Sequence, residues 1–191
     1  MKTRICIGIP TAYTMKSKMV FALTRMIKGL SVDYDVLVHD SPYIHYNRER
    51  LVQRAIDGGY SHIFFIDNDL YFEKDSLERL LSHDKDIIGA DYNYKKLPIE
   101  GILKTENLEG EIIDEMVGDL RKCAGLGTGF LLIKLSVFEK LDHPWFFFEA
   151  DGHGGLRQGE DMWFCNKARK AGFDIWCDTK IKLFHLGEYF F

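Results

Sequence analysis

Two aspartates directly follow an apolar run. Residues 63–66 read Ile-Phe-Phe-Ile, and Asp67, Asn68 and Asp69 come next. Carboxylates this close repel each other unless a cation lies between them. Mg²⁺ and Mn²⁺ take one or two protein carboxylates together with the phosphate oxygens of a substrate. The spacing therefore suggests a metal-assisted phosphate site. The structural alternative is a solvated turn whose carboxylates cap the next helix.

A second acidic pair, Glu160 and Asp161, opens an amphipathic pattern behind a glycine-rich stretch at 151–159. The helix dipole stabilises carboxylates at this position, which is the alternative to a chemical role. The stretch holds His153 among glycines and is expected to be a loop that could close over a ligand. His185 ends the last apolar run. A lone histidine is more often structural, but imidazole beside a carboxylate favours Mn²⁺ over Mg²⁺.

Three further features have less specific chemistry. The run Gly125-Leu-Gly-Thr-Gly129 lacks dinucleotide-binding spacing and precedes a strand, so close approach of a sugar or acceptor to Gly127 is favoured instead. No P-loop motif is present. Trp145 begins an aromatic run that we interpret as core, with stacking on a sugar as the alternative. Lys95 and Lys96 are either solvated or meet a diphosphate.

Short β-rich runs alternate with helical periods, which predicts an α/β fold with a mixed, mostly parallel sheet. Strands are expected at 5–9, 35–39, 62–66, 86–90, 129–134, 174–179 and 180–185. Helices are expected around 19–27, 51–56, 77–81 and 160–171. Ser136 and Glu139 have capping-box spacing before a further short helix. Residues 97–123 have a weak pattern, and we expect loops or short edge strands there.

Composition limits the classes of protein. A chain of 191 residues is too short for a (β/α)₈ barrel or a two-domain dinucleotide enzyme. Its net charge of -4 does not favour nucleic acid as a partner. The first apolar run is too short for a signal peptide or a transmembrane helix. The four cysteines form no CxxC pair and are expected in the core, which indicates a cytoplasmic protein. The apolar tail at 189–191 is expected to pack or to meet a partner.

Taken in order, these motifs resemble those of GT-A fold nucleotide-sugar glycosyltransferases, in particular small forms related to inverting family two. The resemblance covers residues 5–187. It is carried by Pro10-Thr11, the Asn-Arg-x-Arg-Leu-Val run around Arg48, Asp67-Asn68-Asp69, Ile88-Gly-Ala-Asp-Tyr92, the glycines at 125–129, Gly159-Glu160-Asp161 and His185-Leu-Gly. It implies one domain over 1–191, with a nucleotide-binding half at 1–95 and an acceptor-binding half at 96–191.

The resemblance also implies roles for single residues. Asp40 would be the acidic partner of the base, and Arg48 would face the nucleotide. The implied nucleotide site consists of Pro10, Thr11, Ala12, Tyr13, Asp40, Arg48, Asp67 and Asn68. The cofactor would be Mn²⁺ or Mg²⁺. Asp69 would bind the metal ion directly and His185 would be a further ligand. Asp67 would complete the set of metal residues, on the side nearer the ribose.

For catalysis, the resemblance implies that Asp161 is the general base and that Glu160 positions the acceptor. The donor would be a nucleotide sugar, with UDP favoured over GDP, and the acceptor a glycan or another hydroxyl compound. Inversion at the sugar is favoured over retention. The residues expected near the acceptor or sugar are Tyr92, Lys95, Gly127, Trp145 and His153.

Two other functions remain as alternatives. A catalytically silent module that binds a nucleotide sugar or a glycan would keep the metal site. A sugar nucleotidyltransferase would need a glycine-rich, arginine-containing loop after its first strand, and residues 8–13 offer none. The sugar, the acceptor and the oligomeric state are not indicated.

Overall fold

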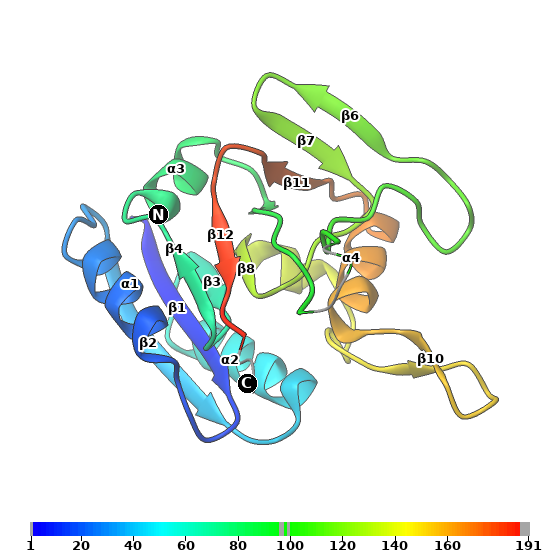
Figure 1. Ribbon diagram of the computed structural model, residues 1–191, viewed down its shortest axis with the longest axis horizontal. Coiled ribbons are helices and arrows are strands. Elements are labelled where there is room, and N and C mark those ends of the chain that lie inside the picture. The colour runs from blue at the N-terminus through cyan, green and yellow to red at the C-terminus, as the bar shows by residue number, and fades with distance from the viewer. Residues whose placement is uncertain (1, 96–97, 99, 188–191) are drawn as a thin grey trace.

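The computed structural model describes residues 2–95, 98 and 100–187, and a central eight-stranded sheet forms its framework (Figure 1). The strand order is β2 (Asp33–Asp40), β1 (Arg4–Thr11), β3 (His62–Ile66), β8 (Phe130–Lys134), β5 (Ile87–Gly89), β11 (Ile175–Asp178), β7 (Leu120–Cys123) and β6 (Asp114–Val117). The β1–β2, β1–β3 and β5–β11 pairs are parallel, and only β8 and β7 oppose the common direction of the sheet. The predicted mixed α/β sheet is confirmed.

Helices cover both faces of the sheet. They are α1 (Ser17–Ile27), α2 (Ile44–Asp57), α3 (Ser76–Ser82) and α4 (Glu160–Lys170), with a 3₁₀ helix, η1 (Leu135–Lys140). Side chains of a strand alternate between the two faces, so β3 sends Phe64 into a core shared with α1 and α3, and Phe65 into one shared with α2 and α4. Such double burial explains why β3 is a continuous apolar run rather than an alternating one.

The chain reaches the same edge of the sheet at the ends of β1, β2 and β3. Thr11 and Asp40 are register partners there, and Asp67 follows β3 directly. Beside this edge lies a separate antiparallel pair of β4 (Leu70–Phe72) and β12 (Leu183–His185). Side chains from four segments can therefore converge at one place.

The strand predicted at 180–185 is shorter than expected, and it lies outside the central sheet. Asp178 ends β11, and its carboxylate accepts a hydrogen bond from the Lys180 N–H at 2.8 Å, which turns the chain out of the sheet. Only residues 183–185 form a strand, and they pair with β4.

The glycine-rich stretch is a hairpin rather than a loop without regular structure. β9 (Glu149–Ala150) pairs with β10 (Leu156–Gln158), and the hairpin projects away from the sheet (Figure 1). Asp151 Oδ1 accepts hydrogen bonds from the N–H groups of His153 and Gly155, at 2.7 and 2.9 Å. The turn is therefore built by a side-chain acceptor.

The Ser136–Glu139 capping box does not form. β8 continues directly into η1, which begins at Leu135 with Lys134 in the capping position and no side-chain cap. Within residues 97–123, where the sequence pattern is weak, residues 114–123 form the β6–β7 hairpin at the edge of the sheet.

The four cysteines are free and buried, as expected. The apolar tail at 189–191 lies outside the described residues, in which no helix is long and apolar enough to cross a membrane.

Candidate active site

A pocket of about 190 Å³ opens at the carboxyl ends of β1, β2 and β3. Crevices at this edge are the usual ligand sites of open α/β sheets. The sequence predicted seven of its lining residues, namely Pro10, Thr11, Ala12, Asp67, Asn68, Asp69 and His185. Four others were not predicted, namely Ser41, Pro42, Ile44 and Asn47.

The β4–β12 pair brings Asp69 and His185 together. His185 lies opposite Leu70, and the Leu186 N–H donates to the carbonyl oxygen of Asp69 at 2.8 Å. Asp69 Oδ1 is 3.3 Å from His185 Nε2. The other carboxylate oxygen of Asp69 contacts the Lys95 ammonium. Burial alone would raise the pKa of Asp69, but the hydrogen bonds and charges of His185 and Lys95 outweigh it and hold this pKa below its ordinary value.

A hydrogen bond to the protein backbone fixes the orientation of the His185 ring. Its Nδ1 lies 2.8 Å from the carbonyl oxygen of Asn93, so Nδ1 must carry a proton. In the neutral imidazole, Nε2 then has a free lone pair, and it faces a carboxylate oxygen. Two acceptors at this distance repel unless a proton or a cation lies between them.

This pair fits a divalent ion such as Mn²⁺ in the chemistry of its donors, one carboxylate oxygen and one imidazole nitrogen. The Asn93 carbonyl is the outer partner that metal-binding histidines usually have. Within the described residues, no group of three or more His, Cys, Asp or Glu side chains could hold a metal. A metal ion here would therefore need substrate oxygens or water to complete its coordination.

Asp67, which lines the same pocket, is bonded to Arg48. The Arg48 guanidinium donates to Asp67 Oδ1 at 3.1 Å and to the Thr128 carbonyl oxygen at 3.3 Å, and its Nε is 3.5 Å from Glu160 Oε1. Burial alone would lower the pKa of Arg48, but the charges of Asp67 and Glu160 outweigh it and raise this pKa. The expectation that Arg48 faces the nucleotide therefore needs correction: it is buried behind two carboxylates and does not line the pocket.

Asp161 lies on the first turn of α4, next to Glu160. Burial and the charge of Glu160 raise the pKa of Asp161 from its ordinary value of 3.8 to about 6. One of its oxygens accepts a hydrogen bond from the Met162 N–H at 2.7 Å. A carboxyl group tuned in this way can act as a base near neutral pH.

The loops at the pocket are joined by side-chain hydrogen bonds. The Asn47 amide donates to the carbonyl oxygens of Thr11 and Ser41, at 3.0 and 2.8 Å, and thereby ties the ends of β1 and β2 to α2. The Asn68 amide donates to Thr11 Oγ1 at 3.2 Å. Asn47 was missed as a site residue, although it stands beside Arg48 in the motif. A polar amide within a helical pattern was the available signal.

The Asp40 carboxylate already binds a backbone N–H group of the protein. Its Oδ1 accepts a hydrogen bond from the Tyr13 N–H at 2.7 Å, and Tyr13 has a positive φ of 75° that turns the loop after β1. The Tyr13 side chain is exposed. A base that bound to Asp40 would therefore use its other carboxylate oxygen.

The residues predicted near the acceptor do not form one group. Tyr92 and Gly127 are buried, and a Cβ at Gly127 would clash with the Tyr92 hydroxyl. Trp145 is 4% exposed and its indole N–H donates to the Leu141 carbonyl oxygen, so it offers no ring face to a sugar. His153 lies in the turn of the projecting β9–β10 hairpin. Two of them contact residues that line the pocket: Lys95 contacts Asp69, and the Tyr92 ring lies edge to face on His185 with the centroids 5.4 Å apart. Lys96 lies outside the described residues.

No protein-family model matches the sequence, and no curated protein matches it significantly. Among solved structures, A197 from STIV superimposes with a TM-score of 0.66 at 20% identity, over 98% of this chain and 87% of that one. GalNAc-T7 with UDP, GalNAc and Mn²⁺ gives a TM-score of 0.54 at 10% identity, over 98% of this chain and 44% of that one. At these identities the comparisons establish a shared fold, the GT-A-like α/β architecture.

Proposed function

We propose that this chain is a metal-dependent glycosyltransferase. It would move a sugar from a nucleoside-diphosphate donor, with UDP favoured, to a hydroxyl acceptor with inversion. The observation that carries the proposal is the Asp69–His185 pair, whose carboxylate oxygen Oδ1 and ring nitrogen Nε2 lie 3.3 Å apart in the pocket. The shared fold with GalNAc-T7, solved with UDP, GalNAc and Mn²⁺, supports the same class of donor.

The donor nucleotide would occupy the 190 Å³ pocket, between the loops that follow β1 and β2. Asp69 and His185 would hold Mn²⁺ or Mg²⁺, which neutralises the charge on a leaving diphosphate. Asn47 and Asn68 keep these loops in place, because both amides are bonded to residues at the end of β1. The half of the chain at 1–95 is therefore assigned to the donor, and the half at 96–191 to the acceptor, except for His185, which belongs to the donor site.

Asp161 would take the proton of the acceptor hydroxyl. As the hydroxyl oxygen attacks the anomeric carbon, the bond from that carbon to the diphosphate breaks, with an oxocarbenium-like state at the sugar. With a pKa of about 6, Asp161 is ionised at neutral pH and is a stronger base than an ordinary aspartate. Glu160 is held in place by Arg48 and would orient the acceptor.

Substitution of Asp161 by Asn tests whether the protein is an enzyme or a catalytically silent binding module. Release of UDP from a panel of UDP-sugars would be measured with Mn²⁺, together with binding of UDP by calorimetry. Asp161→Asn is expected to lower turnover by about 10²–10⁴-fold and to leave UDP binding intact. Asp33→Asn, at the opposite end of β2, is the matched control and should change neither. Turnover equal to the wild type in Asp161→Asn would contradict the assignment. Binding without any turnover in the wild type would favour the silent module.

A further inference from the structure

Four titratable side chains gather where β11 ends, here called the Asp178 cluster and defined as Arg79, His83, Asp119 and Asp178. The Asp178 carboxylate is fully buried and does not line the pocket. Its Oδ2 accepts hydrogen bonds from Arg79 Nε and from His83 Nε2, the latter at 2.8 Å, and both donors come from α3 and its C-terminal end. Burial alone would raise the pKa of Asp178, but these two hydrogen bonds outweigh it and hold this pKa below its ordinary value. The charge at this buried position therefore depends on partners that α3 supplies.

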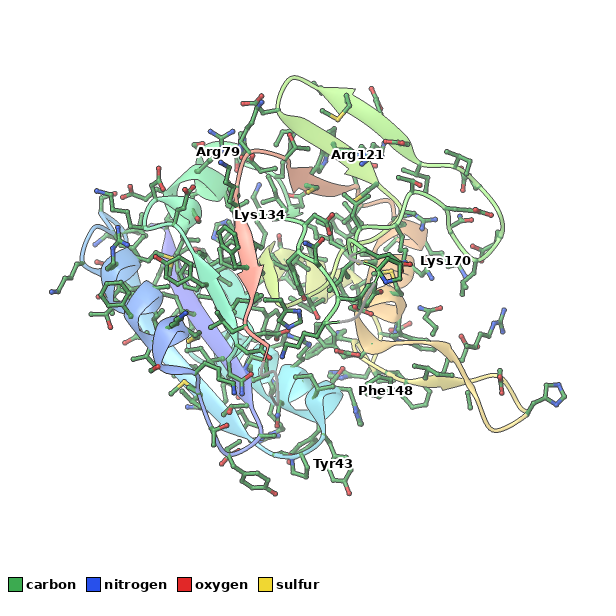
Figure 2. The ribbon with its side chains drawn as sticks, viewed as in Figure 1. Tyr43, Arg79, Arg121, Lys134, Phe148 and Lys170 are labelled. Carbon is green, nitrogen blue, oxygen red and sulfur yellow. The ribbon has the colours of Figure 1, made fainter. Side chains whose placement is uncertain are left out.

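The cluster also binds the chain that leaves β11. Arg79 donates to Asp119 Oδ2 at 3.1 Å, and the carbonyl oxygen of Asp119 accepts hydrogen bonds from the N–H and the hydroxyl of Thr179, at 3.0 and 2.9 Å. Asp178 Oδ1 accepts a hydrogen bond from the Lys180 N–H at 2.8 Å. Figure 2 labels Arg79, which lies beside the chain between β11 and β12. These contacts fix the point at which the chain turns out of the central sheet.

The chain that leaves the Asp178 cluster leads directly to the candidate metal site. Residues 179–184 are all that separates Asp178 from His185. On the way, the side chains of Ile181 and Leu183 are buried in the core that α3 also enters. The cluster is therefore joined to His185 by a short stretch of chain that has its own anchors in the core.

Both ends of this stretch are attached to one continuous segment, residues 69–83. At the far end, β12 pairs with β4, and the Leu186 N–H donates to the Asp69 carbonyl oxygen at 2.8 Å. At the near end, Asp178 is bound by α3. The β4–β12 pairing covers only three residues of each strand, and a two-stranded pairing is at most marginally stable by itself. The place of His185 therefore depends on the near attachment as well as on the far one.

We infer that Arg79, acting through Asp178, positions His185 for the proposed metal ion. Arg79 does not line the pocket, so it acts on the site only through the protein chain. Its simultaneous contacts with Asp178 and Asp119 use two nitrogens of the guanidinium, a fork that a lysine ammonium lacks. This inference rests on the proposed function, because it concerns the metal pair of the same site.

The test follows the His185 ring and the metal ion separately in the variant Arg79→Met. In the wild type without metal, the proton on His185 Nδ1 should give a resolved NMR signal, because its hydrogen bond to the Asn93 carbonyl oxygen slows exchange with water. His185→Gln identifies this signal. Arg79→Met should broaden it or remove it, because the ring no longer stays on Asn93.

The affinity for Mn²⁺ alone, measured by electron paramagnetic resonance, should fall in the same variant. We expect a loss of about three- to tenfold, smaller than the roughly 10–100-fold that follows removal of a direct outer partner of a metal ligand. Arg79→Lys keeps the charge without the fork, and it should change both readouts in the same direction but less. Thermal unfolding checks the fold of each variant, and Arg79→Lys replaces Arg79→Met if the latter does not fold.

The matched control is Arg121→Met, since Arg121 forms its ion pair with Asp114 inside the β6–β7 hairpin and is labelled in Figure 2. It should leave the His185 signal and the Mn²⁺ affinity unchanged. The inference is overturned if folded Arg79→Met keeps the wild-type ring signal or the wild-type Mn²⁺ affinity, or if Arg121→Met changes both readouts equally. If the wild type itself does not bind Mn²⁺, the proposed function fails, and the ring signal alone decides whether Arg79 positions His185.

Discussion

Arg48 donates a hydrogen bond to Asp67 at 3.1 Å, and this contact connects α2 with the acidic motif that follows β3. The same guanidinium reaches Glu160 on α4, so a single buried cation links the two acidic segments that the sequence singled out. The site is therefore organised around a charge that does not line the pocket. Arg48 determines where the carboxylates point.

Replacement of Arg48 by Met should lower the free energy of unfolding by about 3–5 kcal/mol, because it leaves two largely buried carboxylates without their cation. Urea denaturation at pH 7 measures this loss. Arg121→Met is the control, since Arg121 forms a partly exposed bridge to Asp114 and should cost at most about 1 kcal/mol. Equal losses in the two variants would show that Arg48 does not hold the site together.

Asp161 should make the protein less stable as the pH rises from about 4 to about 6. The folded state keeps the proton up to about pH 6, whereas the unfolded chain loses it near 3.8, so deprotonation favours unfolding in this window. Asp161→Asn removes this term and should stabilise the protein at pH 7 by up to about 3 kcal/mol. Denaturation of both proteins at a series of pH values tests this, and parallel stability curves would refute the raised pKa.

Gly129 should not tolerate a side chain. A Cβ there would clash with the carboxylate of Asp67 and with the Tyr92 hydroxyl, which accepts a hydrogen bond from the Gly129 N–H. Gly129→Ala is therefore expected to cost about 1–3 kcal/mol and to weaken UDP binding. Gly29→Ala, where the nearest atom would be 3.6 Å away, is the matched control. Thermal melts and calorimetry give both quantities, and a fully stable Gly129→Ala would contradict this geometry.

Lys95 should compete with a divalent ion for Asp69. Its ammonium contacts the carboxylate oxygen that does not face His185, and both side chains are partly solvent-accessible. Because such ion pairs contribute at most about 1 kcal/mol, Lys95→Met should tighten binding of Mn²⁺ alone by about two- to fivefold. Titration of Mn²⁺ followed by its electron paramagnetic resonance signal measures the change. Weaker Mn²⁺ binding in the variant would mean that Lys95 does not compete with the metal ion for Asp69.

Much of the fold was predictable because it depends on local patterns. The continuous apolar run at 62–66 indicated a doubly buried strand, and the edge at which it ends located Asp67 and Asp69 correctly at the pocket. The hairpin at 149–158 was missed because its two strands are too short to show alternation. The capping-box spacing failed because β8 leads straight into η1.

The other misses depend on contacts between distant segments. The pairing of β12 with β4 rather than with the central sheet is not visible in the local sequence, although it is what brings His185 to Asp69. The burial of Arg48 likewise depends on where α4 places Glu160. Residue type indicated the chemistry of these groups, but only the tertiary structure shows which of them meet.

The most direct test of the account is the thermal shift caused by UDP together with Mn²⁺. Ligand at about 100 times its Kd should stabilise the folded protein by about 2.7 kcal/mol, which raises the melting temperature by several degrees. We predict this shift for the wild type and for Asp33→Asn, and its loss in Asp69→Asn and in His185→Ala. A shift that does not need Mn²⁺, or that persists in both site variants, would contradict the central claim that Asp69 and His185 hold a metal for the donor diphosphate.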